Sequence, residues 1–192
     1  MSELVFLLEE ESAKAMLEGL LPRLLPENVW FRCLVFEGKS DLEGQLVRRL
    51  RGYNTPGARF VILRDQDAAD CLDVKAGLAD LCRQAGRERE CLVRIACKEL
   101  ESWYLADLAA VETGLQVDGL ERLQNRRVFR TPDTVVSPSK ELSRIAPTYQ
   151  KVGGSRAIGP HLDLNNARST SFSVFVAGVR DLARIIKEQQ DG

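Results

Sequence analysis

Short apolar runs alternate with amphipathic stretches over the first hundred residues. The first run, Leu4 to Leu8, ends in three glutamates and a serine, and apolar residues then recur at helical spacing from Ala13 to Leu24. Three further apolar runs precede helical patterns in the same way, at 29–36, 60–63 and 92–96. Four strand–helix units in series predict a Rossmann-like α/β fold, with a parallel sheet and helices on both faces.

The composition of each run indicates where its strand lies in the sheet. The runs at 4–8 and 60–63 are wholly apolar, as is typical of parallel strands that are covered on both faces. Trp30 and Arg32 interrupt the second run, which places that strand nearer an edge of the sheet.

The second half of the chain has a weaker pattern. From about 113 to 171 the periodicity fades and four prolines occur, so we expect irregular chain with short helices, one of them near 138–145. An apolar stripe from Phe172 to Ile186 then predicts a long helix, capped by Thr170 or Ser171, that packs on the core. We therefore expect one structural domain with a core at 1–112 and an irregular and helical extension at 113–192.

The amino-acid composition indicates which class of protein the chain belongs to. Apolar residues make up 44% and charged residues 29%, which is typical of a globular domain. The chain has no basic leader and no run of roughly 20 apolar residues, so we expect a cytoplasmic protein that does not cross a membrane. Its five cysteines show no CxxC spacing, which argues against zinc and disulfides and indicates small buried hydrophobes. The net charge of −1 provides no overall attraction to nucleic acid.

Acidic residues follow every predicted strand, at the edge where open parallel sheets carry their chemistry. They are Glu9, Glu10 and Glu11, then Glu37 and Asp41, then Asp65, Asp67 and Asp70, and finally Glu99 and Glu101. Several of them fit equally well as helix caps or first-turn charges: Glu10, Glu11, Asp41 and Asp70.

Glu9, Asp65 and Asp67 form the strongest candidate metal site. On an extended strand end Asp65 and Asp67 would point the same way, roughly 6.5 Å apart, and would share a cation. Glu101 is a further candidate ligand. Oxygen ligands without a nearby cysteine or histidine favour Mg²⁺ or Mn²⁺ over zinc.

These residues resemble known families. A strand ending in Glu and a later strand ending in Asp-x-Asp is similar to the TOPRIM domain of topoisomerases, primases and nucleases. LLEEESAKAML, EGKSDLE, VILRDQDAADC, RIACKELESWYLAD and YQKVGGSRAIGPHLDLNNARSTSF together resemble the family called domain of unknown function 4276. The resemblance implies that Glu9, Asp65 and Asp67 bind metal, and it implies a bacterial genome-defence role with an ATPase partner. Glu10 stands where TOPRIM proteins have glycine, which leaves the choice between Glu9, Glu10 and the Glu37 of EGKSD open.

Basic residues suggest how phosphates would be held. Lys39 lies in GKS, but Cys33 occupies the position where a P-loop needs its first glycine, so only a simple phosphate contact is expected. Lys151 and Arg156 flank the glycine pair of KVGGSR, where the backbone would approach a phosphate. The only histidine, His161, is interpreted as structural.

Together these features predict a Mg²⁺-dependent nuclease. Glu9, Asp65 and Asp67 would place the metal, which activates water, and Glu9 or Glu10 would exchange protons with the reacting oxygens. The expected partners are nucleic acid, DNA rather than RNA, and an ATPase protein; a homodimer is also left open. Two alternatives stay open: a non-catalytic regulatory module that binds metal or a phosphorylated ligand, and a small-nucleotide phosphohydrolase, which needs a deep pocket.

Overall fold

The computed structural model describes residues 3–191 and confirms the Rossmann-like α/β fold. The four strands are β1 (Glu3–Leu8), β2 (Trp30–Val35), β3 (Arg59–Asp65) and β4 (Cys91–Ala96), all parallel and in the order β2-β1-β3-β4. The helices are α1 (Glu11–Leu24), α2 (Lys39–Arg51), α3 (Cys71–Gln84), α4 (Glu101–Leu105), α5 (Leu108–Leu115), α6 (Arg127–Arg130), α7 (Pro138–Ile145), α8 (Lys151–Ile158) and α9 (Thr170–Asp191).

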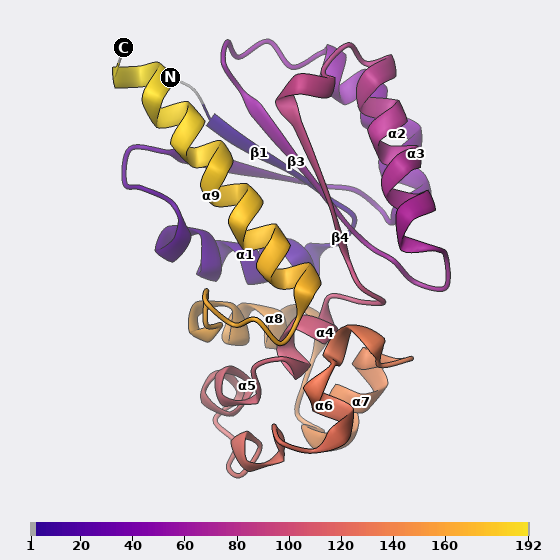
Figure 1. Cartoon of the computed structure of the whole chain (residues 1–192), viewed down its shortest axis with the longest axis vertical. Helices are drawn as coiled ribbons and strands as arrows, with labels where there is room; N and C mark the ends of the chain where they lie inside the picture. Colours follow the sequence, from indigo (N-terminus) through magenta and orange to yellow (C-terminus); the bar gives the residue numbers. More distant parts are fainter. Residues whose placement is uncertain (1–2, 192) are drawn as a thin grey trace.

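The central strands are buried on both faces, as their apolar runs predict. No residue from 4 to 8 in β1 exposes more than 1% of its surface. Alternate side chains of β1 enter two cores: Leu4 belongs to the core that includes residues of α1 and α9, and Val5 to the core that includes residues of α2 and α3. Figure 1 shows these two pairs of helices on opposite sides of the sheet. The prediction that the second strand lies at an edge is confirmed, and Trp30 in β2 is 64% exposed.

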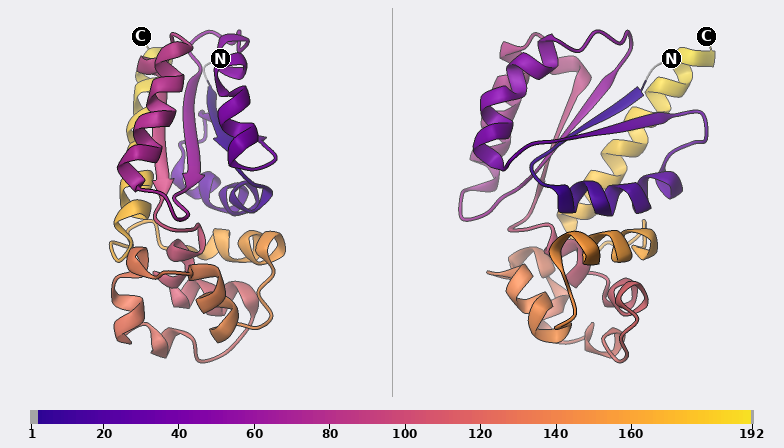
Figure 2. Two further views of the ribbon diagram at one scale, coloured as in Figure 1. Left: turned by 90° about the vertical axis from the view of Figure 1, so that its right-hand side faces the viewer. Right: turned by 180° about the vertical axis from the view of Figure 1, so that it is seen from behind.

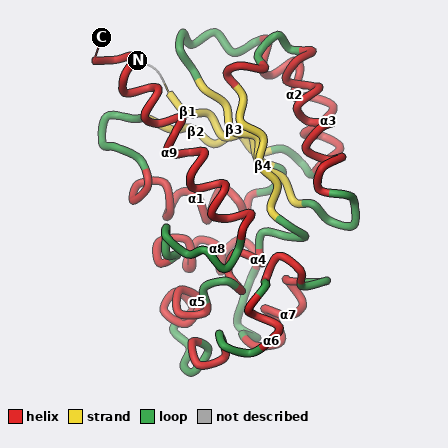
Figure 3. Tube along the Cα trace, in the orientation of Figure 1, coloured by secondary structure: helices red, strands yellow, loops and turns green. Residues whose placement is uncertain are grey.

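A layer of short helices lies beyond the carboxyl ends of the strands. This helical layer comprises α4 to α8 and the turns between them, residues 101–161, and Figure 2 shows it at the end of the molecule opposite the two marked termini. The short helices are joined by loops (Figure 3), in agreement with the faded periodicity. The predicted helix at 138–145 is confirmed as α7. The helical layer therefore covers the edge of the sheet where the acidic residues emerge.

Helix α8 was not predicted, because its two glycines are poor helix formers. Glycines instead let α8 and the turn after it approach other elements closely. A Cβ added to Gly154 would lie 2.4 Å from the ring of Tyr149, and one added to Gly159 would lie 2.3 Å from the Met16 carbonyl oxygen in α1. KVGGSR is thus a packing helix, and the expectation that its glycine pair exposes backbone to a phosphate is wrong for Gly154.

Helix α9 returns to cover the sheet, as its apolar stripe predicts, but its cap differs from the prediction. Ser169 caps the helix, since its Oγ accepts the N–H of Phe172 at 3.1 Å. Ser171 is unavailable because its Oγ accepts the indole N–H of Trp103 at 2.8 Å. Within residues 3–191 we find no helix that combines the length and the apolar character needed to cross a membrane.

The cysteines are free thiols, and only Cys82 is fully buried. The interpretation of all five as buried hydrophobes is therefore too broad. The other four, Cys33, Cys71, Cys91 and Cys97, are partly exposed.

Candidate functional site

The strand register brings Glu9 beside Asp65. Strands β1 and β3 are neighbours, with Leu8 opposite Leu63, so the residues that follow β1 and those that end β3 meet at one edge. The backbone N–H of Asp65 donates to Glu9 Oε2 at 3.3 Å, and Arg64 Nε lies 3.8 Å from the same oxygen. Burial raises the pKa of Glu9, although the Asp65 N–H opposes that shift.

Among the carboxylates at this edge, that of Asp65 has the fewest hydrogen-bond donors and positive charges around it. Its carboxylate accepts no hydrogen bond from any residue that the structure describes, yet three other carboxylates, those of Glu101, Glu9 and Glu10, act on it. Burial, followed by those three charges, raises the pKa of Asp65 well above its usual range, and Lys151 opposes the shift. An ionised Asp65 at neutral pH therefore needs an additional positive charge.

Glu101 forms the inner wall of this group. It is the first residue of α4, is only 1% exposed, and accepts a hydrogen bond from the Tyr149 hydroxyl at 2.9 Å. Burial raises the pKa of Glu101. The fully buried Tyr104 hydroxyl also lies within the electrostatic influence of Glu101 and Asp65, and its nearest polar partner is Ser155, with which it forms no hydrogen bond of normal geometry. The buried side of the site is thus rich in acidic and hydroxyl oxygens.

Two lysines neutralise the outer carboxylates. Lys39, the first residue of α2, lies with its Nζ 2.9 Å from Asp67 Oδ2, and Lys151, the first residue of α8, forms an ion pair with Glu10. These side chains, with Glu9, Asp65 and Glu101, define what we call the acidic edge: Glu9, Glu10, Asp65, Asp67 and Glu101, with Lys39 and Lys151 as counter-ions.

The predicted extended geometry of Asp65 and Asp67 is wrong. Strand β3 ends at Asp65, and Asp67 has a φ of 57° in the turn that follows, where its N–H donates to the Lys98 carbonyl at 2.8 Å. This turn directs Asp67 to Lys39 instead of aligning it with Asp65. The two aspartates therefore have different partners, although Asp67 still contributes to raising the pKa of Glu9.

The space at the acidic edge is small. A depression of about 10 Å³ is lined by Glu9, Glu10, Arg64 and Asp65, with Ser12, Ala13, Leu63 and Leu100. Across residues 3–191, no three His, Cys, Asp or Glu side chains already stand in the arrangement of a metal centre. The carboxylates surround Asp65 without converging on one point.

The remaining predicted residues lie further out. Arg156 is exposed on α8, and Glu37 is exposed after the edge strand β2, where its N–H donates to Asp41 at 3.0 Å. Asp41 therefore serves the local turn, and Asp70 caps α3 through the N–H groups of Leu72 and Asp73, as the alternative interpretation of both residues predicts.

Sequence reasoning missed the residues that arrange the carboxylates. Arg64, buried at the end of an apolar strand, approaches Glu9 and pairs with Glu43 of α2. An arginine inside an otherwise apolar run was the available signal. Tyr149 gave no signal, because its contact with Glu101 depends on the path of the irregular segment before α8.

Comparison with known proteins adds one positive finding. The model of the family described as domain of unknown function (DUF4276) matches residues 8–180. That span begins at the last residue of β1, ends within α9, and includes the whole acidic edge. Searches of curated proteins and of solved structures found no match.

Proposed function

Taking as our premise that the chain belongs to the DUF4276 family, we propose that its acidic edge binds Mg²⁺ or Mn²⁺ and hydrolyses nucleic acid phosphodiesters, as a TOPRIM-like nuclease. The observation that carries the proposal is the poorly compensated negative charge of the Asp65 carboxylate. The charges of Glu101, Glu9 and Glu10 act on this carboxylate, which has no hydrogen-bond donor among the described residues, and Lys151 is the main charge that lowers its pKa. A hard divalent cation compensates such a group better than a second lysine, because it binds several oxygens at once.

The residues fit a partly hydrated ion better than a closed protein cage. Mg²⁺ usually keeps several waters and is bound through one or two carboxylates, so three converging ligands are not required. Asp65 would be the central ligand, with Glu9 and Glu10 beside it and Glu101 in the inner wall. Asp67 would join only if it leaves Lys39. When bound, the ion would act as a Lewis acid and lower the pKa of a coordinated water.

The chain's own residues would supply proton transfer and substrate positioning. Burial raises the pKa of Glu9, so it holds a proton more readily than an ordinary glutamate and suits exchange with a reacting oxygen. Lys39 and Lys151 are about half exposed, with side-chain exposures of 51% and 50%, and they would move from their acids to substrate phosphates. Arg156, exposed on α8, would add a further phosphate contact.

The volume of the depression distinguishes the two candidate enzyme activities, that of a nuclease and that of a small-nucleotide phosphohydrolase. About 10 Å³ does not hold a nucleotide, whereas a phosphodiester on an extended strand would lie across the edge without entering a deep pocket. This favours a polymer substrate over a small nucleotide. DNA as that polymer, an ATPase partner and a role in bacterial genome defence remain proposals that derive from the TOPRIM resemblance.

Cleavage assays test the proposal directly. Purified protein is incubated with supercoiled plasmid or single-stranded DNA in Mg²⁺ or Mn²⁺, and Asp65→Asn is compared with Asp181→Asn, an exposed carboxylate on α9. We expect cleavage by the wild type and by Asp181→Asn, and a loss of at least about 100-fold in Asp65→Asn, which removes the charge that holds the ion.

The same variants distinguish the non-catalytic alternative. Calorimetric titration with Mn²⁺ should show binding that Asp65→Asn lacks. Metal binding without cleavage would replace the nuclease by a metal-sensing module, while cleavage that survives in Asp65→Asn or in chelator would place the chemistry elsewhere.

A further inference from the structure

A second polar cavity lies in the helical layer and shares no residue with the acidic edge. Its volume is about 500 Å³, and its lining comes from the two stretches 107–125 and 161–168. Cavities of a few hundred Å³ are typical of small-molecule sites. This cavity is therefore large enough for a ligand, in contrast to the depression beside Asp65.

The floor of the cavity is held by buried polar side chains. Asp107 and Gln124 are each 8% exposed. Asp107 accepts the N–H groups of Ala110 at 3.1 Å and of Asp163 at 2.7 Å, and Gln124 accepts the N–H of Leu108 at 2.8 Å and donates to two backbone carbonyls. These bonds tie together segments that are distant in the sequence. The floor is consequently preformed, and its polar atoms already form hydrogen bonds within the protein.

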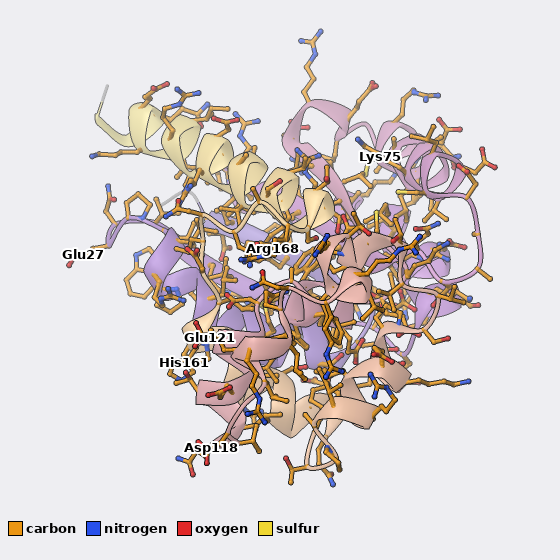
Figure 4. All side chains as sticks on the ribbon, turned by 60° about the horizontal axis from the view of Figure 1, so that its bottom comes forward. Glu27, Lys75, Asp118, Glu121, His161 and Arg168 are labelled. Carbon is orange, nitrogen blue, oxygen red and sulfur yellow. The ribbon has the colours of Figure 1, made fainter. Side chains whose placement is uncertain are left out.

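The rim of the cavity carries polar side chains that form no hydrogen bond or ion pair with other described residues. Glu121, Asn125, His161 and Arg168 are exposed, and no hydrogen bond or ion pair joins their side chains to another described residue. In Figure 4, in which the helical layer is turned toward the viewer, Glu121 and His161 are labelled next to each other, and Arg168 is labelled apart from them, nearer α9. Four free side chains from separate segments thus border one preformed cavity.

The charges of the lining select the class of ligand. The lining contains three carboxylates, those of Asp107, Glu121 and Asp163, and one guanidinium, that of Arg168. This excess of negative charge repels phosphates and nucleotides. It favours a molecule that has one anionic group and two cationic groups. The anionic group would pair with Arg168. The cationic groups would pair with Glu121 and with the Asp163 carboxylate oxygen that does not accept the Asn165 N–H.

We propose that this cavity binds a small zwitterion with an additional cationic group, the chemistry of a free basic amino acid. The ligand carboxylate lies in the fork of the Arg168 guanidinium. Its ammonium and its side-chain cation lie against Asp163 and Glu121, and Asn125 and His161 supply further hydrogen bonds.

Titration calorimetry of the full chain tests the proposal, with L-arginine and L-lysine as probes and L-glutamate and AMP as counter-probes. We expect saturable binding of arginine and lysine, weaker binding of glutamate and no binding of AMP. Arg168→Ala and Glu121→Gln should each weaken arginine binding by about tenfold or more, because each removes one charge-assisted contact. Arg168→Lys should retain part of the affinity, since it keeps the charge and loses the fork.

Arg184→Ala is the matched control, since Arg184 is an exposed arginine on α9 whose one ion pair among the described residues is with Asp181. It should bind arginine like the wild type, and circular dichroism should show the same fold for all variants. The proposal is overturned by an absence of saturable binding of both basic amino acids, by undiminished binding in Arg168→Ala, or by a preference for AMP. None of these outcomes bears on DNA cleavage, which is measured without added amino acid.

Discussion

At the scale of single residues, Asp65 and Asp70 show how differently two aspartates after one strand are used. Asp70 accepts the N–H groups of Leu72 and Asp73 at the start of α3, which is the ordinary role of an aspartate before a helix. Asp65 receives no such donor and faces other carboxylates. The position of Asp65 at the strand end and the capping role of Asp70 were both predictable from the sequence, but the surroundings of Asp65 depend on the turn at Asp67, which no local pattern indicates.

Asp65→Asn should stabilise the metal-free protein. In chelator at pH 7, the amide removes the charge that Glu9, Glu10 and Glu101 repel, and we expect a gain of about 1–3 kcal/mol in the free energy of unfolding. Because the folded-state pKa of Asp65 is raised above its unfolded value, the folded protein binds more protons between the two values. The wild type should therefore lose stability as pH rises through that window.

Urea unfolding at several pH values in chelator measures this effect. The stability of Asp65→Asn should fall less steeply with pH than that of the wild type, and the Asp181→Asn control should follow the wild type. Equal slopes for Asp65→Asn and the wild type would show that Asp65 is adequately compensated by its own surroundings.

Two tyrosines near Glu101 provide a matched pair. Tyr149→Phe removes the hydrogen bond to Glu101 and should destabilise the protein by about 1–2 kcal/mol, since it leaves a buried carboxylate with one donor fewer. Tyr104→Phe removes a fully buried hydroxyl that makes no hydrogen bond of normal geometry and has only Ser155 nearby, so stability should change by less than about 0.5 kcal/mol. Thermal unfolding of both variants measures the difference. A larger loss for Tyr104→Phe would reveal a bond that the Tyr104 hydroxyl makes.

At the scale of elements, the strands and the long helices follow from the hydrophobic pattern, whereas α8 does not. Strands β1 and β3 are apolar throughout because the sheet is covered on both faces. Helix α8 contains adjacent glycines, whose low helix propensity concealed it. Gly154 is required by its contact with Tyr149, a residue outside the helix, so no pattern within α8 indicates its role.

Adjacent glycine-to-alanine substitutions in α8 test this account. A Cβ on Gly154 would lie 2.4 Å from the Tyr149 ring, so Gly154→Ala should destabilise the protein by about 1–3 kcal/mol through overpacking. On Gly153 the nearest atom would be 4.0 Å away, so Gly153→Ala should stabilise it by about 0.5–1 kcal/mol. Chemical denaturation compares the two variants. A stabilising Gly154→Ala would mean that Tyr149 is free to move aside.

At the scale of the whole molecule, the helical layer and the sheet share one hydrophobic core. Trp103 of α4 packs against Phe172 and Phe175 of α9, with ring centroids 5.2 and 5.0 Å away, and α9 in turn covers the sheet. The loss of periodicity predicted irregular chain with short helices after about residue 113, and the apolar stripe predicted that the last helix packs on the core. The contact between Trp103 and the start of α9 was not predictable, since it joins segments about 70 residues apart.

Tryptophan fluorescence tests whether this shared core unfolds as one unit. Trp30 is 64% exposed and Trp103 is 1% exposed, so Trp30→Phe leaves a single buried reporter between the helical layer and α9. Urea unfolding followed by fluorescence and by far-ultraviolet circular dichroism should give the same midpoint, as a two-state transition requires. An earlier fluorescence transition would mean that the helical layer opens before the sheet.

Under the proposed function, the two lysine ion pairs at the acidic edge would make cation binding an exchange reaction. Lys39 and Lys151 already neutralise Asp67 and Glu10, so an incoming ion would compete with positive charges that the protein carries itself. Each displaced ammonium would then become available to an anion. Metal binding would thereby free ammonium groups on a surface whose charges had been paired with each other, and this surface would then attract phosphate. The ion would bind first and the polyanion second.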